Sequence, residues 1–232
     1  MKKVVISLGG SVLVQDKINV DFLKKFKKII LNFGKNNKVV IVTGGGKTTR
    51  TYINGLREVK LDEKELSLMG IRITRLNALF LTKFFFPKTK YRKVPMKLKN
   101  VTRKLKKENI VICGALEYEP DQTSDGTAAE VAERIKADYL MNITNVKGLY
   151  DKDPGKYRNA NLIKKISWQD FLRIVNKLKF MAGQHFILDK NAAIILSKRD
   201  IDTFIVKDDI KQIENILRDK AFIGTSIVTT LE

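Results

Sequence analysis

Two polar segments hold the side chains of this chain that are best suited to chemistry. They lie within residues 121–154, DQTSDGTAAEVAERIKADYLMNITNVKGLYDKDP, on either side of a small-residue helix and an apolar strand. Hydroxyl, amide and carboxylate groups next to a helix start are typical of sites that handle phosphates or nucleotides. The side chains concerned are Thr123, Ser124 and Asp125 in the first segment and Thr144, Asn145, Tyr150 and Asp153 in the second.

Two glycine-rich segments offer backbone amides to the same kind of ligand. Residues 9–10 (GG) follow the apolar run 4–8, and residues 44–47 (GGGK) follow the run 38–43 and precede a helix with Arg50. The spacing matches neither the G-x-G-x-x-G nor the G-x-x-x-x-G-K-[ST] motif. Tight turns without a ligand are the alternative, but two such segments, each between a strand and a helix, favour phosphate binding.

Apolar runs of strand length alternate with segments of helical periodicity. This alternation predicts an α/β fold with an open, mainly parallel sheet flanked by helices, and with ligands at the carboxyl edge of the strands. We expect one continuous domain, 1–232, with two lobes and with 61–69 as a loop or short helix. The expected strands are 4–8, 38–43, 110–113, 139–143, 162–166, 203–206 and 224–228, and the main expected helices are 21–33, 71–84, 97–108, 124–135, 167–177, 186–199 and 209–219.

The chain is strongly basic, with 45 lysine and arginine residues against 25 acids and a formal net charge of +20. The densest run, 88–108, holds ten basic residues and one acid. Such a run attracts polyanions in principle. We favour a simple solvated basic face, or one that gathers anionic nucleotides, over an RNA-binding surface, because the run has one tyrosine and no recognised motif.

Other features narrow the class of protein. The only cysteine, Cys113, lies in an apolar run, which excludes an intramolecular disulfide and favours a reducing compartment. The apolar N-terminal run meets Gly-Gly and indicates a strand rather than a signal peptide. No stretch has the roughly 18 uninterrupted apolar residues of a membrane span. The only histidine, His185, cannot join a His-rich metal site, and we expect a surface or capping role for it. We therefore expect a cytoplasmic protein.

Five motifs together resemble the amino-acid kinase superfamily and, within it, the archaeal type of uridylate (UMP) kinase. They are LGGS near the start, GGGK with an arginine soon after, GIRITRLNA, TSDGTAA and ITNVKGLYDKDP. The resemblance covers essentially the whole chain, and the TRLNA and ITNVKGLYDKDP elements are its specific parts.

The resemblance implies a three-layer fold with an acceptor lobe, about 1–115, and an ATP lobe, about 116–232. The implied reaction is transfer of the ATP γ-phosphoryl group to UMP with Mg²⁺, giving UDP and ADP, in a homo-oligomer that is typically a hexamer. In-line phosphoryl transfer depends on positioning and charge neutralisation, which glycine loops can supply through their amides.

Residue roles follow from the resemblance motif by motif. Asp125 would orient the lysine or the metal at the transferring phosphate, and no protein ligand for a metal is assigned. The residues implied for ATP are Gly9, Gly10, Gly46, Arg50, Thr144, Asn145, Tyr150 and Asp153, and those implied for UMP are Gly45, Ser67, Pro120, Asp121, Gln122 and Thr123.

Three positions depart from the family pattern. Ser7 stands where many members have a lysine, whose charge would offset the charge developing on the phosphoryl oxygens. Lys47, beside the second glycine segment, is our candidate for a substitute cation. Ser67 stands where an aspartate commonly binds the ribose, and its neutral hydrogen bond is weaker by about 1 to 2 kcal/mol. Asp121 stands where glycine is frequent.

These departures keep two alternatives open. One is a kinase of the same superfamily that acts on another small molecule, such as isopentenyl phosphate or an N-acetylated amino acid. The other is a catalytically weak nucleotide-binding or regulatory protein that uses its basic run to touch RNA. The TRLNA and TSDGTAA elements favour a nucleotide acceptor, whereas Ser7 and Ser67 are the features that support the weak binder.

Overall fold

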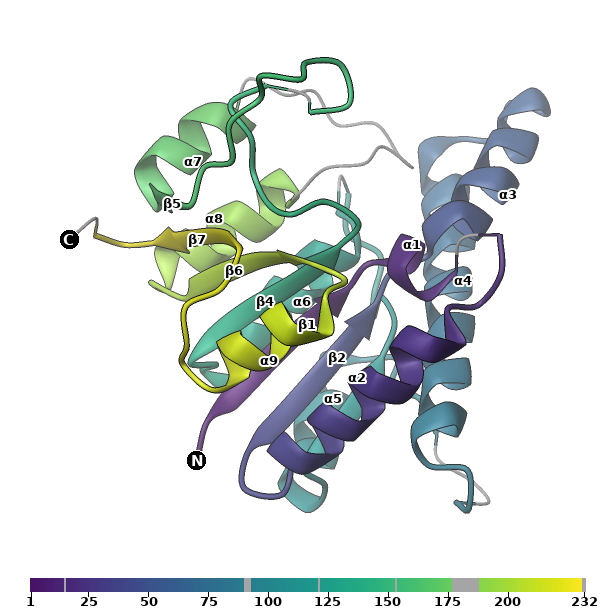
Figure 1. Ribbon diagram of the computed structural model, residues 1–232. Coiled ribbons are helices and arrows are strands. Elements are labelled where there is room, and N and C mark those ends of the chain that lie inside the picture. The colour runs from purple at the N-terminus through teal and green to yellow at the C-terminus, as the bar shows by residue number, and fades with distance from the viewer. Residues whose placement is uncertain (15, 90–92, 121, 153, 177–187, 231–232) are drawn as a thin grey trace.

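Seven strands form one sheet in the order β3-β2-β1-β4-β6-β7-β5 (Figure 1). The computed structural model describes residues 1–14, 16–89, 93–120, 122–152, 154–176 and 188–230. All neighbouring strands run parallel except β6 and β7, which are antiparallel. The strands are β1 (Lys3–Leu8), β2 (Lys38–Thr43), β3 (Ile110–Cys113), β4 (Tyr139–Thr144), β5 (Lys165–Ser167), β6 (Asp202–Lys207) and β7 (Gly224–Val228). The expected open, mainly parallel sheet is therefore confirmed.

Helices cover both faces of this sheet and complete a three-layer arrangement (Figure 1). Apolar side chains of α5, α6, α7 and α8 pack on one face, and those of α2, α4 and α9 pack on the other. The helices are α1 (Gly10–Leu13), α2 (Val20–Phe33), α3 (Gly46–Glu58), α4 (Glu63–Phe85), α5 (Leu98–Lys107), α6 (Ser124–Ile135), α7 (Trp168–Val175), α8 (Lys190–Lys198) and α9 (Ile210–Leu217).

The central strand β1 is apolar on both sides, because each face of the sheet is covered by helices. Val5 belongs to the core beneath α6, whereas Val4 and Ile6 belong to the core beneath α2. Ser7 interrupts this pattern and is only 1% exposed. In the parallel pairing of β1 with β4, Ser7 lies opposite Asn142, a second buried polar residue.

The described part of the basic run lies largely at the surface. Its described helix, α5, buries Val101 and Leu105 against the core, while Lys99, Lys106 and Lys107 are exposed. Lys97 and Lys104 form ion pairs with Glu117 and Glu108. Residues 90–92 of the run lie outside the described residues.

The sequence interpretation was wrong in one long segment and inexact at several ends. Residues 61–69 do not form a loop or a separate short helix, since α4 runs unbroken from Glu63, with the Asp62 carboxylate accepting a hydrogen bond from the Glu65 amide. The residues after Gly9 form the single helical turn α1 rather than an open turn. Strand β5 begins at Lys165 and α8 begins at Lys190, both later than expected.

Candidate active site

A cavity of about 110 Å³ opens at the carboxyl ends of β1, β2 and β4, where α1, α3 and α6 begin (Figure 1). We call it the inner cavity. Parallel strands bring their carboxyl ends to one edge of a sheet, which is why segments distant in sequence meet here. The lining residues are Gly9, Gly10, Ser11, Gly44, Gly45, Gly46, Arg50, Thr123, Ser124, Asp125, Asn142 and Thr144.

The two glycine segments touch each other backbone to backbone in this cavity. A Cβ atom on Gly10 would overlap the amide nitrogen of Gly46, and one on Gly46 would lie 2.5 Å from the Gly10 carbonyl carbon. Gly46 also has a φ of +67°, which side-chain-bearing residues rarely adopt. No side chain caps α3 at its Gly45 end, so its first amides are available to an anion.

Asp125 places a carboxylate in the inner cavity under unusual electrostatic conditions. The Ser7 hydroxyl donates to Asp125 Oδ1 over 2.6 Å. Burial and, to a lesser extent, the nearby carboxylate of Asp189 raise the pKa of Asp125 to about 7, although the hydrogen bond from Ser7 opposes the shift. The side chain therefore exchanges its proton near neutral pH.

Asp189 is also buried, at 1% exposure, but several hydrogen-bond donors surround its carboxylate. Its Oδ2 accepts from the Thr123 amide, the Thr123 hydroxyl and the Gly126 amide at 2.6 to 3.1 Å, and its Oδ1 accepts from the Ala192 amide at 2.7 Å. These donors belong to the starts of α6 and α8, where helix dipoles also favour a negative charge. Asp189 was missed in the sequence, where an aspartate ahead of an apolar periodic run indicates only a helix cap.

A second cavity, of about 160 Å³, lies beside the first, and we call it the acceptor cavity. It brings together four residues predicted for UMP, namely Gly45, Ser67, Gln122 and Thr123. Gly45, Gly46, Arg50, Thr123 and Ser124 line both cavities. The two cavities are therefore adjacent compartments with shared walls.

Two threonines of the acceptor cavity were also missed in the sequence. The hydroxyls of Thr49 and Thr127 are buried and have no hydrogen-bond partner in the part of the chain that the structure describes. An unpaired buried hydroxyl is costly unless a ligand or water satisfies it. The polar atoms of a phosphate-bearing ligand would fit this need.

Helix α4 holds the walls of the acceptor cavity through the TRLNA residues. The Asn77 amide donates to the Gly44 carbonyl over 2.8 Å, and the Thr74 hydroxyl accepts from the Ala115 amide over 2.9 Å. The Arg75 guanidinium donates to the carbonyls of Ala115 and Leu116. Each of these bonds fixes a loop that lines the cavity, and Asn77 is a residue that sequence reasoning did not select.

Ser7 reaches the inner cavity only through its hydrogen bond to Asp125, and four more predicted residues line neither cavity. Lys47 forms an exposed ion pair with Asp16 at 2.5 Å. Asn145 and Pro120 are exposed, and Tyr150 is bridged to Leu162 in the loop between β4 and β5. Asp121, Asp153 and His185 lie outside the described residues.

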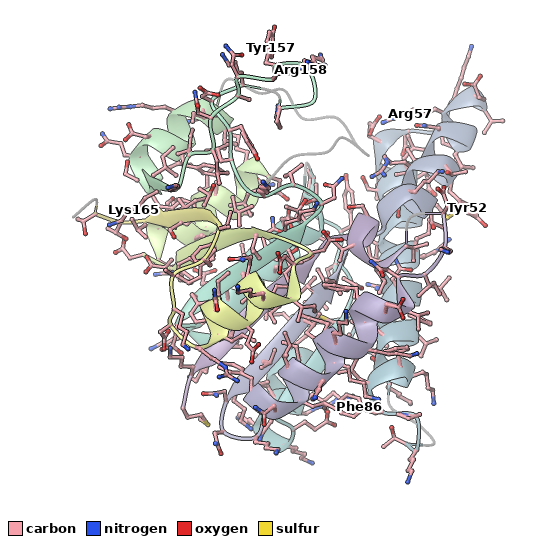
Figure 2. The ribbon with its side chains drawn as sticks, in the orientation of Figure 1. Tyr52, Arg57, Phe86, Tyr157, Arg158 and Lys165 are labelled. Atoms are coloured by element: carbon pink, nitrogen blue, oxygen red, sulfur yellow. The ribbon has the colours of Figure 1, made fainter. Side chains whose placement is uncertain are left out.

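That β4–β5 loop and α3 rise from the same end of the molecule. Figure 2 shows Tyr157 and Arg158 on the loop and Arg57 near the end of α3, all projecting from this end. The loop is anchored below by Thr225, whose hydroxyl accepts from the Leu149 amide over 2.8 Å and donates to the Ile163 carbonyl over 2.6 Å. A loop that is tied at its base can still present its tip to a ligand.

The part of the chain that the structure describes contains neither a metal-binding cluster nor a membrane-spanning helix. No group of three or more histidine, cysteine, aspartate or glutamate side chains in this part of the chain could hold a metal ion. Within the same residues, no helix combines the length and apolar character needed to cross a bilayer.

Known proteins of one family resemble this chain over nearly its full length. The model of the amino acid kinase family matches residues 2–207. A uridylate kinase of Thermoplasma volcanium is 35% identical over 226 residues, which are 97% of each chain. The crystal structure of uridylate kinase from Archaeoglobus fulgidus superposes with a TM-score of 0.84 at 34% identity, covering 98% of this chain and 100% of that chain.

A more distant structure supports the fold alone. The UMP kinase of Bacillus anthracis gives a TM-score of 0.81 at 22% identity and covers 99% of this chain and 97% of its own. The resemblance seen in the five sequence motifs is thus confirmed along the chain and in three dimensions. This chain belongs to the amino acid kinase family.

Proposed function

We propose that this protein is a UMP kinase, which transfers the γ-phosphoryl group of ATP to UMP and gives UDP and ADP. The observation that carries this proposal is the pair of adjacent cavities with common walls at Gly45, Gly46 and Arg50. Phosphoryl transfer needs an acceptor and a donor phosphate held in line at short distance, which two joined compartments can provide. Relatives that are uridylate kinases match this chain over nearly its full length, which favours UMP as the acceptor.

UMP would occupy the acceptor cavity. Gly45 and the unpaired hydroxyls of Thr49 and Thr127 would bind its phosphate, because all three line the wall nearest the shared loops. Ser67 would face the ribose. The Gln122 side chain, which bonds to Glu130, would contact the rest of the nucleotide, and Pro120 and Asp121 would border it.

The phosphates of ATP would occupy the inner cavity, with the first amides of α3 and the guanidinium of Arg50 as donors. Gly9, Gly10 and Gly46 would let the backbone approach the phosphates closely. Thr144 lies at the cavity, and Asn145, Tyr150 and Asp153 would extend the site towards the adenosine.

Mg²⁺ suits an oxygen-rich cavity, since it usually keeps several waters and binds one or two carboxylates together with substrate phosphates. Ser124 and Asp125 would hold its coordinated waters at the inner cavity. When bound, it neutralises charge on the phosphates and thereby stabilises the transition state.

We also propose the organisation implied by the family. Residues 1–115 would form the acceptor lobe and 116–232 the ATP lobe, in a cytoplasmic homo-oligomer, as a hexamer. Exposed apolar side chains on α3 and α4, including Leu76 and Leu79, support an interface there. Tyr52 on α3 is a further one (Figure 2). The free, buried Cys113 agrees with a reducing compartment.

Lys47 stays our candidate for a cation that serves the phosphates, although Asp16 holds it at the surface. Exposed ion pairs are weak and can exchange partners when a phosphate binds. Lys47→Ala should then lower turnover in a coupled ADP-release assay, and near wild-type turnover would exclude the role.

The reaction is tested with purified protein, ATP and Mg²⁺ against UMP, CMP, dUMP, isopentenyl phosphate and acetylglutamate. We expect product with UMP at the highest kcat/KM. Preference for a non-nucleotide would assign the chain to another kinase of the family. ATP binding without phosphorylation of any acceptor would leave a nucleotide-binding protein, and RNA binding that persists at about 0.2 M salt would then support the regulatory alternative.

A further inference from the structure

Three polar side chains form a cluster beneath the inner cavity, on the face of the sheet that α6 covers. Ser7 and Asn142 lie opposite each other in the β1–β4 register, and both interrupt apolar strands at 1% and 4% exposure. Neighbouring strands are about 4.8 Å apart, so these two side chains are adjacent. Asp125 completes the cluster through its 2.6 Å hydrogen bond with Ser7, and it lines the cavity together with Asn142.

The cluster contains one carboxylate, that of Asp125, and few nearby groups offset its negative charge. In the described part of the chain, the Ser7 hydroxyl is the one hydrogen-bond donor that reaches the Asp125 carboxylate, whereas the neighbouring Asp189 accepts four. Lys47 is paired with Asp16, and among the described residues Arg50 is the one cationic side chain that lines the cavity. A phosphate entering the cavity would therefore meet a carboxylate beside it.

We propose that Ser7, Asp125 and Asn142 form a binding site for a monovalent metal cation, such as K⁺, next to the transferring phosphoryl group. The cation would bind the Asp125 carboxylate, the Ser7 hydroxyl and the amide oxygen of Asn142, and its open side would face the phosphate oxygens. It would offset the negative charge that otherwise repels the phosphate. This inference rests on the proposed phosphoryl transfer for the identity of the neighbouring group.

The donor set favours a single positive charge. All three protein ligands are oxygens, and one carboxylate carries their whole formal charge. Mg²⁺ loses its waters reluctantly and demands near-ideal octahedral geometry, which a serine and an asparagine on adjacent strands with one carboxylate do not supply. Hard monovalent ions accept neutral oxygen ligands and looser geometry.

The test compares salts at equal ionic strength, with the full chain, ATP, UMP and Mg²⁺ present throughout. UDP formation should rise about tenfold or more when KCl replaces choline chloride, since choline is too large for the site. Under the same conditions without turnover, with ADP and UMP bound, KCl should also raise the thermal unfolding midpoint above that in choline chloride.

Ser7→Lys supplies a tethered ammonium group where the cation would sit. This variant should lose the dependence of both rate and unfolding midpoint on K⁺. Asn32→Lys adds the same charge on an exposed position of α2, remote from the cavity, and should keep the full K⁺ response. If Ser7→Lys does not fold, Ser7→Ala replaces it, and the K⁺ concentration that gives half the maximal rate should rise several-fold.

The outcomes separate this inference from the proposed reaction. Equal UDP formation and equal unfolding midpoints in KCl and choline chloride would overturn the cation site and leave the kinase intact. No UDP in any salt, together with a K⁺-specific rise of the midpoint that Ser7→Lys abolishes, would overturn the kinase and retain the site. A K⁺ response that Ser7→Lys and Asn32→Lys both keep in full would place the cation elsewhere and refute the assignment.

Discussion

The inner cavity and the acceptor cavity share walls but are built in different ways. The inner cavity is formed mainly by backbone, where Gly10 and Gly46 pack without side chains between them, and one carboxylate, that of Asp125, lines it. The acceptor cavity is formed by side chains of α3, α4 and α6, and α4 fixes its loops through Thr74, Arg75 and Asn77.

This difference suggests different tolerance to change. A contact between two backbone segments leaves no room for an added Cβ atom, because protein interiors are close-packed. The main chain would have to move to accommodate the atom. A side-chain wall can be altered one group at a time, which lets the acceptor preference change while the transfer site stays the same. Ser67, where the resemblance implies an aspartate, would be one such alteration.

The largest effect is expected from Gly10→Ala in the inner cavity. The added Cβ overlaps the Gly46 amide nitrogen, so the two glycine segments must separate. A displacement of about 1 Å at a transfer site can reduce turnover ~100-fold. Steady-state kinetics of UDP formation would measure it.

Gly55→Ala is the matched control for Gly10→Ala. Gly55 lies in α3, is exposed and has no atom within 4 Å of the added Cβ. Activity should be unchanged, and stability should rise by roughly 0.5 to 1 kcal/mol because alanine is a better helix former than glycine. Equal losses of activity in both variants would contradict the backbone packing argument.

Asp189→Asn should be the next largest change, and it should act on stability. An amide NH₂ would face backbone donors of α6 or α8 that now bond to a carboxylate, at a cost of about 2 to 3 kcal/mol. Urea unfolding would show the loss. Asp209→Asn changes an exposed cap of α9 in the same way and should be nearly neutral, since both residues cap helices well.

Ser67→Asp tests the acceptor wall. A charge-assisted bond to a ribose hydroxyl would strengthen UMP binding by about 1 to 2 kcal/mol, which lowers KM for UMP roughly 5- to 30-fold. KM for ATP should not change. Ser67→Asn has nearly the same size without the charge and should give little of the gain; an identical gain would assign the effect to shape.

At Asp125 the expected effect depends on pH. Its pKa in the folded protein, about 7, lies above its ordinary value of 3.8, so the folded state binds the proton more tightly than the unfolded state does. Stability from this group is therefore present below pH 3.8 and is lost as pH rises to about 7.

Asp125→Asn cannot titrate and removes this dependence. Relative to the variant, the wild type should lose up to about 4 kcal/mol between acidic and slightly alkaline pH, which lowers its Tm. Asp189 and Arg50 face the same region and are unchanged in both proteins. A difference in Tm that is constant with pH, measured without K⁺ or nucleotide, would contradict the raised pKa.

The strands and most helices could be predicted because their signals are local. The run Val4–Leu8 is apolar on both faces, and Gly34 follows a helical stripe of apolar residues. The start of α4 was missed because its first residues, Glu63 to Ser67, are mostly polar and show little periodicity, and their helical state depends on the Asp62 cap and on packing of Leu66.

The candidate active site could likewise be predicted from the sequence only in part. Glycine segments after strands and the polar residues near Asp125 pointed to phosphate chemistry from residue types and order alone, because strand ends in a parallel sheet meet at one edge. The partners of those residues could not be found in this way. Ser7 and Asp125 are 118 positions apart, and Thr123 and Asp189 are 66 apart.

The sequence by itself thus determined the fold class, the family and the edge of the sheet where the phosphates should bind. Only the tertiary structure decided which buried groups face one another. In the folded protein, Asp189 accepts four hydrogen bonds, Asp125 accepts one from the Ser7 hydroxyl, and Lys47 forms an ion pair with Asp16. The physical reason is that burial and charge pairing depend on distances between segments remote along the chain, and these distances exist only once the strands have paired.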